Sequence, residues 1–224
     1  MSFTRTIVCL ANSKKPHGHC VAGKQQVAGG GWQWIRPVGV TEGREVTDKD
    51  IKFEDHSYPR TLDIIEIDFE KTDNHPYQAE NLIIDPTTYW VKTGRVSLPD
   101  LAALVDRPQT LWEPGYTSTS GHNDRVPSLL LNIQRPSLYL IRPEQMRVTV
   151  GAEAAKFNDM RRKVRTHFSY AGVHYSLKLT DPIAEDYYLG KQDGEYVVPN
   201  VSYITVSLAE IYNGYAYKVV AAVL

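Results

Sequence analysis

The sequence predicts a mainly β protein that consists of two small barrels and a few short helices. Short stretches of alternating apolar and polar residues recur along the chain, and Gly, Pro, Asn or Asp separates them, which is typical of strands joined by turns. Tyrosine is frequent, with 14 copies, as expected for residues that fill strands and their interfaces. The chain has 224 residues, enough for two domains of about 100 residues each, so two barrels of about five strands fit its length.

The alternating stretches place strands one after another along both halves of the chain. They lie at residues 6–11, 32–38, 62–69, 82–84, 129–133, 138–141, 146–150, 164–170, 173–179, 203–208 and 217–223. A further strand is expected to begin at or near Val21 and Ala22, so that residues 12–20 form a loop at the rim of the first barrel. The glycine run at 29–31 is expected to form the tip of a hairpin.

Helical patterns are few. Ser97 stands at an N-cap position with a proline two residues later, which predicts a short helix over 97–105. Gly and Asn interrupt a second candidate at 151–162, and tyrosines are frequent in a third at 182–189. The third candidate follows Asp181, a residue type that caps helices, so a strand is expected to end there and a helix to begin.

A turn-rich stretch divides the predicted strands into two sets. Residues 107–127 show little periodicity and contain many turn-forming residues, which predicts a long connection. We therefore expect a first barrel with a C-terminal short helix at 1–106, a connecting segment at 107–127 and a second barrel at 128–224.

Composition and charge limit the class of protein and its compartment. Hydrophobic residues make up 42% and charged residues 23% of the chain, and the formal net charge is -1, as in ordinary soluble globular proteins. Any affinity for nucleic acid must therefore come from local charge. No apolar stretch has the length of a signal peptide or a transmembrane helix, so we expect a cytoplasmic protein without membrane contact. In that reducing compartment both cysteines are expected to be free thiols.

The densest local chemistry lies in the first 41 residues, which hold five Lys or Arg and no Asp or Glu. Lysines among conformationally free glycines are typical of a site for an anionic group such as phosphate. Arg36 is expected at the mouth of the first barrel, because Pro37 ends its strand and Trp34 shares its face. The candidate ligand-binding residues here are Ser13, Lys14, Lys15, His17, His19, Lys24, Trp34 and Arg36. A solvated hairpin whose lysines only add solubility is the alternative.

Metal, covalent and cofactor chemistry is not indicated by the same stretch. Its two cysteines and two histidines are of the types that bind zinc, but their spacing differs from the usual paired units. Cys9 is expected to be a small buried residue within a strand. Cys20 lies beside cations that favour a thiolate, yet no acid that would orient a base is nearby. The glycine run lacks the spacings of a Walker A loop and of a dinucleotide fingerprint, so we expect no metal and no cofactor.

A second basic block supplies the remaining candidate ligand-binding residues, Arg161, Arg162, Lys163 and Arg165. Cations beside aromatic rings are the mixture that single-stranded nucleic acid uses, and Phe168, Tyr170 and Tyr175 lie close by in the sequence. Strand alternation puts Arg165, His167 and Ser169 on one face and the first two rings on the other. The cations and the rings therefore need not meet one ligand, and an exposed basic strand edge over an aromatic core is the alternative.

Several stretches carry a resemblance to a known family. They read CLANSKK at 9–15 with GHCVAG at 18–23, WIRPV at 34–38, FSYAGVHYSLKLTDP at 168–182, and VSLAE at 206–210 with YKVVAA at 217–222. Together they resemble the dual OB-fold domain family of bacterial proteins, over nearly the whole chain. The resemblance implies two tandem OB-like barrels and a nucleic-acid or nucleotide-binding role, one often suspected in bacterial defence against mobile elements.

The residues and the resemblance together favour a nucleic-acid or nucleotide-phosphate binding module. Single-stranded DNA or RNA is the favoured partner, a free nucleotide stays open as a ligand, and the setting would be bacterial defence or nucleic-acid processing. One alternative is an enzyme that modifies or hydrolyses a nucleotide, with a cluster of Lys15, His17, His19, Cys20 and Arg36. Another is a module that recruits a protein partner. An enzyme needs an acid and base of defined geometry, and only the histidines beside Gly18 offer one, which favours binding over catalysis.

Overall fold

The computed structural model describes residues 2–15, 18–41, 43–154 and 159–224. The described chain divides into two compact units. Unit 1 comprises the chain up to Val105 together with Asn132–Ser137, and unit 2 comprises Asp106–Leu131 and Leu138–Leu224. Each unit is built around one β-sheet, which confirms the prediction of a mainly β protein. The segment 107–127, expected to be a connection, lies within unit 2.

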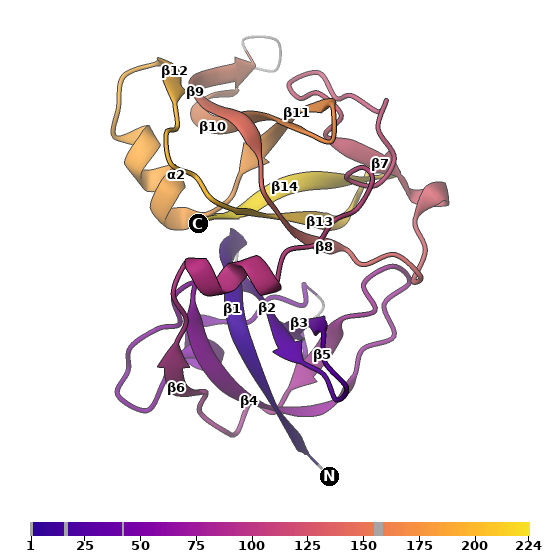
Figure 1. The fold of residues 1–224 in the computed structure, drawn as a ribbon, viewed down its shortest axis with the longest axis vertical. Coiled ribbons are helices and arrows are strands. Elements are labelled where there is room, and N and C mark those ends of the chain that lie inside the picture. The colour runs from indigo at the N-terminus through magenta and orange to yellow at the C-terminus, as the bar shows by residue number, and fades with distance from the viewer. Residues whose placement is uncertain (1, 16–17, 42, 155–158) are drawn as a thin grey trace. The chain divides into compact units, whose positions relative to one another are not determined.

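Unit 1 is a closed barrel with one additional strand (Figure 1). Its elements are β1 (Phe3–Lys15), β2 (Gly18–Gln26), β3 (Trp32–Val38), α1 (Asp48–Ile51), β4 (Asp63–Thr72), β5 (Asn81–Ile84), β6 (Val91–Arg95) and the 3₁₀ helix η1 (Pro99–Ala103). The strand order β1-β2-β3-β5-β4 closes because β1 also pairs with β4, and β6 pairs with β4 as well. β3 and β5 run parallel. A closed five-stranded barrel of this kind is the architecture of the OB fold.

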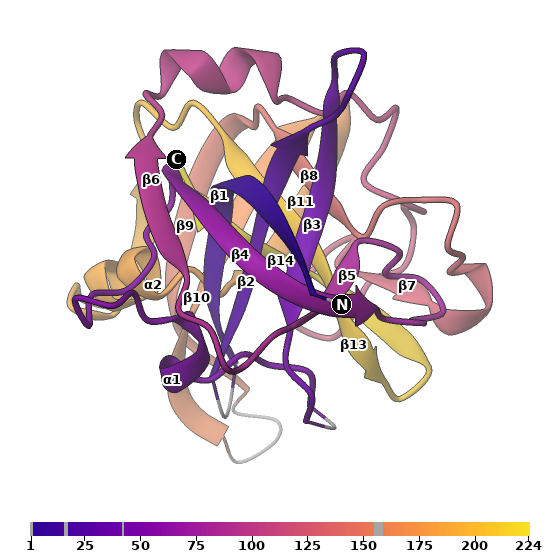
Figure 2. The ribbon, with the colours of Figure 1, turned by 90° about the horizontal axis from the view of Figure 1, so that it is seen from below.

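The first strand closes the barrel because it has partners on both sides (Figure 2). Its first half, up to Val8, pairs with β4, and its second half pairs with β2, with a register shift near Cys9 that bends the strand. Gly23 on β2 permits a close approach here, since a Cβ would lie 2.3 Å from the carbonyl oxygen of Val8. The inward side chains form the core, which includes Ile7, Cys9, Val21, Ile35, Ile65, Ile67, Phe69 and Trp90.

Unit 2 repeats the arrangement with its first strand in two pieces (Figure 1). Its elements are β7 (Arg125–Pro127), the 3₁₀ helix η2 (Ser128–Leu130), β8 (Leu138–Ile141), β9 (Glu144–Ala154), β10 (Asp159–Tyr170), β11 (Val173–Leu179), α2 (Pro182–Leu189), β12 (Gly194–Val197), β13 (Ile204–Tyr212) and β14 (Tyr215–Val223). β8 pairs with β13 while β9 pairs with β10, so the two together take the place that β1 has in unit 1. β11 and β14 run parallel, as β3 and β5 do.

Strong local signals in the sequence coincide with observed elements. The strands expected at 32–38, 138–141 and 173–179 are β3, β8 and β11. The Asp181 carboxylate caps α2, because it accepts hydrogen bonds from the backbone N–H groups of Ile183 at 3.0 Å and Ala184 at 3.1 Å.

Three local predictions are wrong. The expected loop at 12–20 is mostly strand, since β1 continues to Lys15 and β2 begins at Gly18. In the helical candidate at 151–162, residues 155–158 lie outside the described residues, and the rest falls on the end of β9 and the start of β10. Pairing between these strands overrides a helical pattern already interrupted by Gly and Asn. The strand expected at 129–133 is absent, since Leu129 is 94% exposed and its segment follows Pro127 as a 3₁₀ turn.

Candidate functional site

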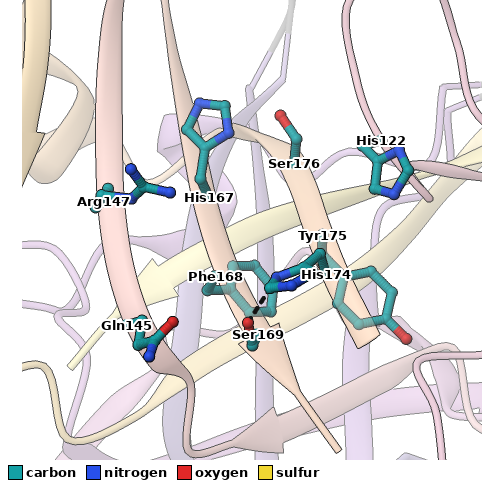
Figure 3. Close-up of a pocket in the computed structure, with 9 residues that line it drawn as sticks. All are labelled: His122, Gln145, Arg147, His167, Phe168, Ser169, His174, Tyr175 and Ser176. Carbon is teal, nitrogen blue, oxygen red and sulfur yellow. Dashed lines mark hydrogen bonds between the residues drawn. The ribbon is translucent and has the colours of Figure 1, made fainter. Parts of the chain in front are cut away.

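A polar pocket opens on the outer face of unit 2, over β9, β10 and β11 (Figure 3). We call it the histidine pocket; its volume is about 380 Å³, and it is lined by His122, Gln145, Arg147, His167, Phe168, Ser169, His174, Tyr175 and Ser176. Strand alternation explains the lining. Within the pocket, the outward residues of β10 and β11 are histidines and serines, while Phe168 and Tyr175 point inward and stack with ring centroids 5.6 Å apart. An aromatic core therefore supports a polar outer surface.

Two of the histidines are held by neighbouring hydroxyl groups. His167 Nε2 lies 2.9 Å from Thr149 Oγ1, and His174 Nδ1 lies 2.7 Å from Ser169 Oγ (Figure 3). Each ring is thus fixed through one nitrogen. Burial, reinforced by the charge of the nearby Arg165, lowers the pKa of His167 below its ordinary value of 6.5, so this imidazole is neutral at pH 7.

The third histidine comes from the segment before β7. His122 extends the sheet at the edge of β11, because its N–H donates to the carbonyl oxygen of Ser176 at 3.1 Å and its own carbonyl accepts from Ser176 N–H at 2.9 Å. Asn123 Nδ2 donates to the His174 carbonyl oxygen at 2.9 Å. Lys218 on β14 secures the same segment, since its Nζ donates to the Glu113 carbonyl oxygen at 3.0 Å. Interior contacts of unit 2 therefore position His122.

Arg147 is the exposed cation of the histidine pocket. It lies on β9 opposite His167 in the register, and Figure 3 shows its guanidinium extended toward that ring. Nη1 donates to Glu195 Oε1 on β12 at 2.8 Å, and both side chains of this pair are about half exposed. A guanidinium in this setting retains further donors that a ligand can use.

The second basic block divides between the outer face and the end of α2. Lys163 and Arg165 alternate with buried residues on β10 and so share the outer face with His167. Arg165 is largely buried, and its Nε donates to Glu153 Oε1 at 2.6 Å. Arg162 instead donates to Asp193 Oδ1 at 2.6 Å and to the Leu189 carbonyl oxygen at 2.7 Å. Arg161 is exposed, and Lys178, opposite Arg165 on β11, adds an exposed cation to the outer face.

In unit 1 the N-terminal cluster forms the end of a hairpin. Strand pairing sets Lys15 opposite Gly18, Lys14 opposite His19 and Ser13 opposite Cys20. Lys14 is exposed, whereas Lys15 Nζ donates to the Gly43 carbonyl oxygen at 3.3 Å. His19 is held between Asn12 Oδ1 at 2.8 Å and Asp48 Oδ1 at 2.9 Å. Ser13 is buried, and the predicted site residue His17 lies outside the described residues.

The other expected members of that cluster lie in the interior of unit 1. Lys24 is buried, and its Nζ donates to the Leu104 carbonyl oxygen at 2.6 Å and lies 5.0 Å from the centre of the buried Trp34 ring. Arg36 is buried on β3 rather than exposed at a barrel mouth, because Nη2 donates to Ser137 Oγ at 2.7 Å and lies 3.3 Å from Glu80 Oε1. A phosphate contact requires an exposed cation, so these residues are not part of the site proposed below.

Sequence reasoning missed most of the histidine pocket. His122, the two β9 residues Gln145 and Arg147, and His174 come from three separate parts of the sequence, and backbone pairing brings these parts together. One signal was available: Ala171 and Gly172 form a two-residue turn with φ of 49° and 76°, the positive values of a type I′ hairpin. That turn sets His174 opposite Ser169. Among the described residues, no group of three or more side chains is placed to hold a metal ion.

Both units have the strand topology of the OB fold, a fold found in many binding modules. Among family models, that of the dual OB-containing domain matches residues 5–223. The chain therefore belongs to the dual OB-containing domain family, as the resemblance implied. No curated protein and no solved structure matches the sequence. Within the described ranges, no helix is long and apolar enough to cross a membrane.

Proposed function

We propose that this protein binds single-stranded nucleic acid on the outer face of β9, β10 and β11, with the histidine pocket at the centre of the contact. The observation that carries the proposal is the position of this pocket. OB folds bind oligonucleotides on the face of their second and third strands, and β10 and β11 occupy those places in unit 2. A polar pocket on that face is therefore where such a ligand is expected.

The chemistry of the face suits a strand of nucleotides. Arg147 and Lys178 are exposed cations that can contact backbone phosphates. Imidazole rings and guanidinium planes serve as stacking platforms for unpaired bases, and His174 and His122 are both exposed. Ring nitrogens, hydroxyls and the Gln145 carboxamide supply donors and acceptors for base edges. This mixture favours an extended, flexible ligand over a double helix.

The hairpin end of unit 1 offers a second contact. Lys14 and Lys15 lie where β1 turns into β2, and the loop between the first two strands is one that OB folds use for oligonucleotides. We include these lysines as phosphate contacts of unit 1. A role in nucleic-acid processing or bacterial defence, as the family resemblance implies, is the setting we propose for such binding.

Fluorescence anisotropy with a labelled oligothymidylate of about 12 nucleotides, within the range of OB-fold site sizes, tests the proposal. Arg147→Ala is expected to weaken binding by roughly 10-fold or more, because a charge-assisted contact contributes about 1.5–3 kcal/mol. Arg5→Ala is the matched control, since Arg5 is an exposed arginine on β1. The proposal fails if the oligonucleotide does not bind at low salt, or if the two variants weaken binding equally.

A further inference from the structure

A second cavity adjoins the histidine pocket in unit 2. We call it the valine groove; its volume is about 480 Å³, and its distinctive lining is Pro143, Met146, Val197, Val198, Asn200 and Val201. Gln145 and Arg147 line both cavities and so form their common wall. The surface changes from imidazoles and hydroxyls on one side of this wall to aliphatic and thioether groups on the other. Val197 is 73% exposed, so much of this apolar surface is open.

The common wall is produced by an irregularity in β9. His167 lies opposite Arg147, but Ser169, two residues on, lies opposite Glu144, so β9 has an additional residue there. Within this bulge Gln145 has a φ of 53°, a left-handed conformation that is costly for a residue other than glycine. Bulges are frequent beside functional sites because they redirect side chains. Here the bulge lies at the residues, Gln145 and Arg147, that line both cavities.

We propose that the valine groove is a subsite for one nucleobase, and that a single-stranded nucleic acid bound in the histidine pocket continues over Arg147 into the groove. This inference rests on the function proposed above. The aliphatic side chains of Val197, Val198 and Val201 suit the flat face of an aromatic base. The carboxamides of Gln145 and Asn200 offer donor and acceptor pairs for its edge. The shortest ligand that uses the complete site is therefore a dinucleotide.

The distribution of charge along the two cavities supports the same path for the bound nucleic acid. The Arg147 guanidinium lies on the wall between the two cavities, which is the place of the phosphate that links two successive nucleotides. The groove itself contains no charged lining residue except Arg147 among the described residues. An apolar subsite beside a cationic wall matches a neutral base attached to an anionic backbone.

Calorimetric titration with thymidine monophosphate, a thymidine dinucleotide and the same dinucleotide with one base removed tests the inference. Base contact with a protein surface is expected to make the intact dinucleotide bind about 10-fold more tightly than the mononucleotide. Val197→Glu fills the groove with a charged side chain and is expected to abolish this gain. Ile183→Glu is the matched control, because Ile183 is 75% exposed on α2 and does not line the groove.

The outcomes separate this inference from the function on which it rests. If a longer oligonucleotide binds but mononucleotide and dinucleotide bind the wild type equally, the base subsite is refuted and nucleic-acid binding stands. The same holds if the abasic dinucleotide binds as tightly as the intact one, or if Val197→Glu and Ile183→Glu behave alike. If no oligonucleotide binds at all, the proposed function is refuted together with the subsite.

Discussion

The buried Lys218 is expected to make the free energy of unfolding of unit 2 rise as the pH rises above 7. Its side chain is 1% exposed on β14, and burial lowers its pKa from the ordinary value of 10.5 to about 7, although Asp124 and Glu113 partly oppose the change. The folded pKa lies below the unfolded one, so the unfolded chain binds more protons between these values. Burial of the charged amine therefore lowers the free energy of unfolding by its full amount below pH 7, and this loss of stability disappears as the pH rises from 7 toward 10.5.

The size of the effect follows from the two pKa values. One pKa unit corresponds to about 1.36 kcal/mol, so at pH 7 the buried amine lowers the free energy of unfolding by about 4 kcal/mol relative to a lysine of ordinary pKa. Between pH 7 and pH 8.5 the unfolded chain retains the proton while the folded chain, already half deprotonated at pH 7, releases it. The free energy of unfolding is therefore expected to rise by about 1.5 kcal/mol over this interval.

Urea unfolding of the wild type and of Lys218→Met, followed by circular dichroism at pH 7 and pH 8.5, measures this difference. The wild type is expected to gain about 1.5 kcal/mol relative to Lys218→Met between the two pH values. Lys178→Met, which changes an exposed lysine on β11, is expected to retain the wild-type dependence. If the free energies of unfolding of wild type and Lys218→Met change in parallel with pH, the buried amine does not control the pH dependence and the reasoning is refuted.

Three further predictions concern the candidate contacts. Arg36→Ala is expected to lower the free energy of unfolding by about 3–5 kcal/mol, because it breaks a buried ion pair, and a urea midpoint equal to that of the wild type would contradict this role. Joint replacement of Lys14 and Lys15 by Ala is expected to weaken oligonucleotide binding by about 1–3 kcal/mol in anisotropy titrations, while Cys20→Ser leaves the affinity unchanged. A larger loss of affinity for Cys20→Ser than for the double lysine variant would favour an enzyme. The affinity for the oligonucleotide is expected to rise between pH 7 and pH 5.5. The pKa of His167 is lowered in the free protein, and a bound phosphate favours protonation of its ring. If a His167→Gln variant shows the same rise, this residue is not the cause.

The sequence predicted the fold through local patterns that tertiary contacts reinforce. Alternation over 173–179 and 138–141 located β11 and β8, and Asp181 located the start of α2. Elements without a strong local signal were missed or misassigned. The 151–162 stretch is the clearest example, since only strand pairing assigns its described residues, 151–154 and 159–162, to β9 and β10. Local propensity is a weak guide wherever strand pairing supplies the stabilisation.

The candidate site was harder to predict because charge in the sequence does not show exposure. Lys24 and Arg36 stand in an acid-free stretch, yet their partners are the Leu104 carbonyl and Glu80, which are far away in the sequence. The histidine pocket was hard to predict for a different reason. Its residues come from separate strands and from the segment that carries His122, so no local motif in the sequence indicates them. The family resemblance identified the fold but carried no set of site residues to the chain.

Chemical-shift mapping tests the central claim most directly. Backbone amide spectra of the isotope-labelled protein are recorded during titration with an oligothymidylate of about 12 nucleotides at low salt. We expect the largest shift changes on the outer face of β9, β10 and β11, centred on the residues around Arg147, His167 and His174, with smaller changes at the β1–β2 hairpin. Changes confined to other elements, or no changes at saturating oligonucleotide, would contradict the account.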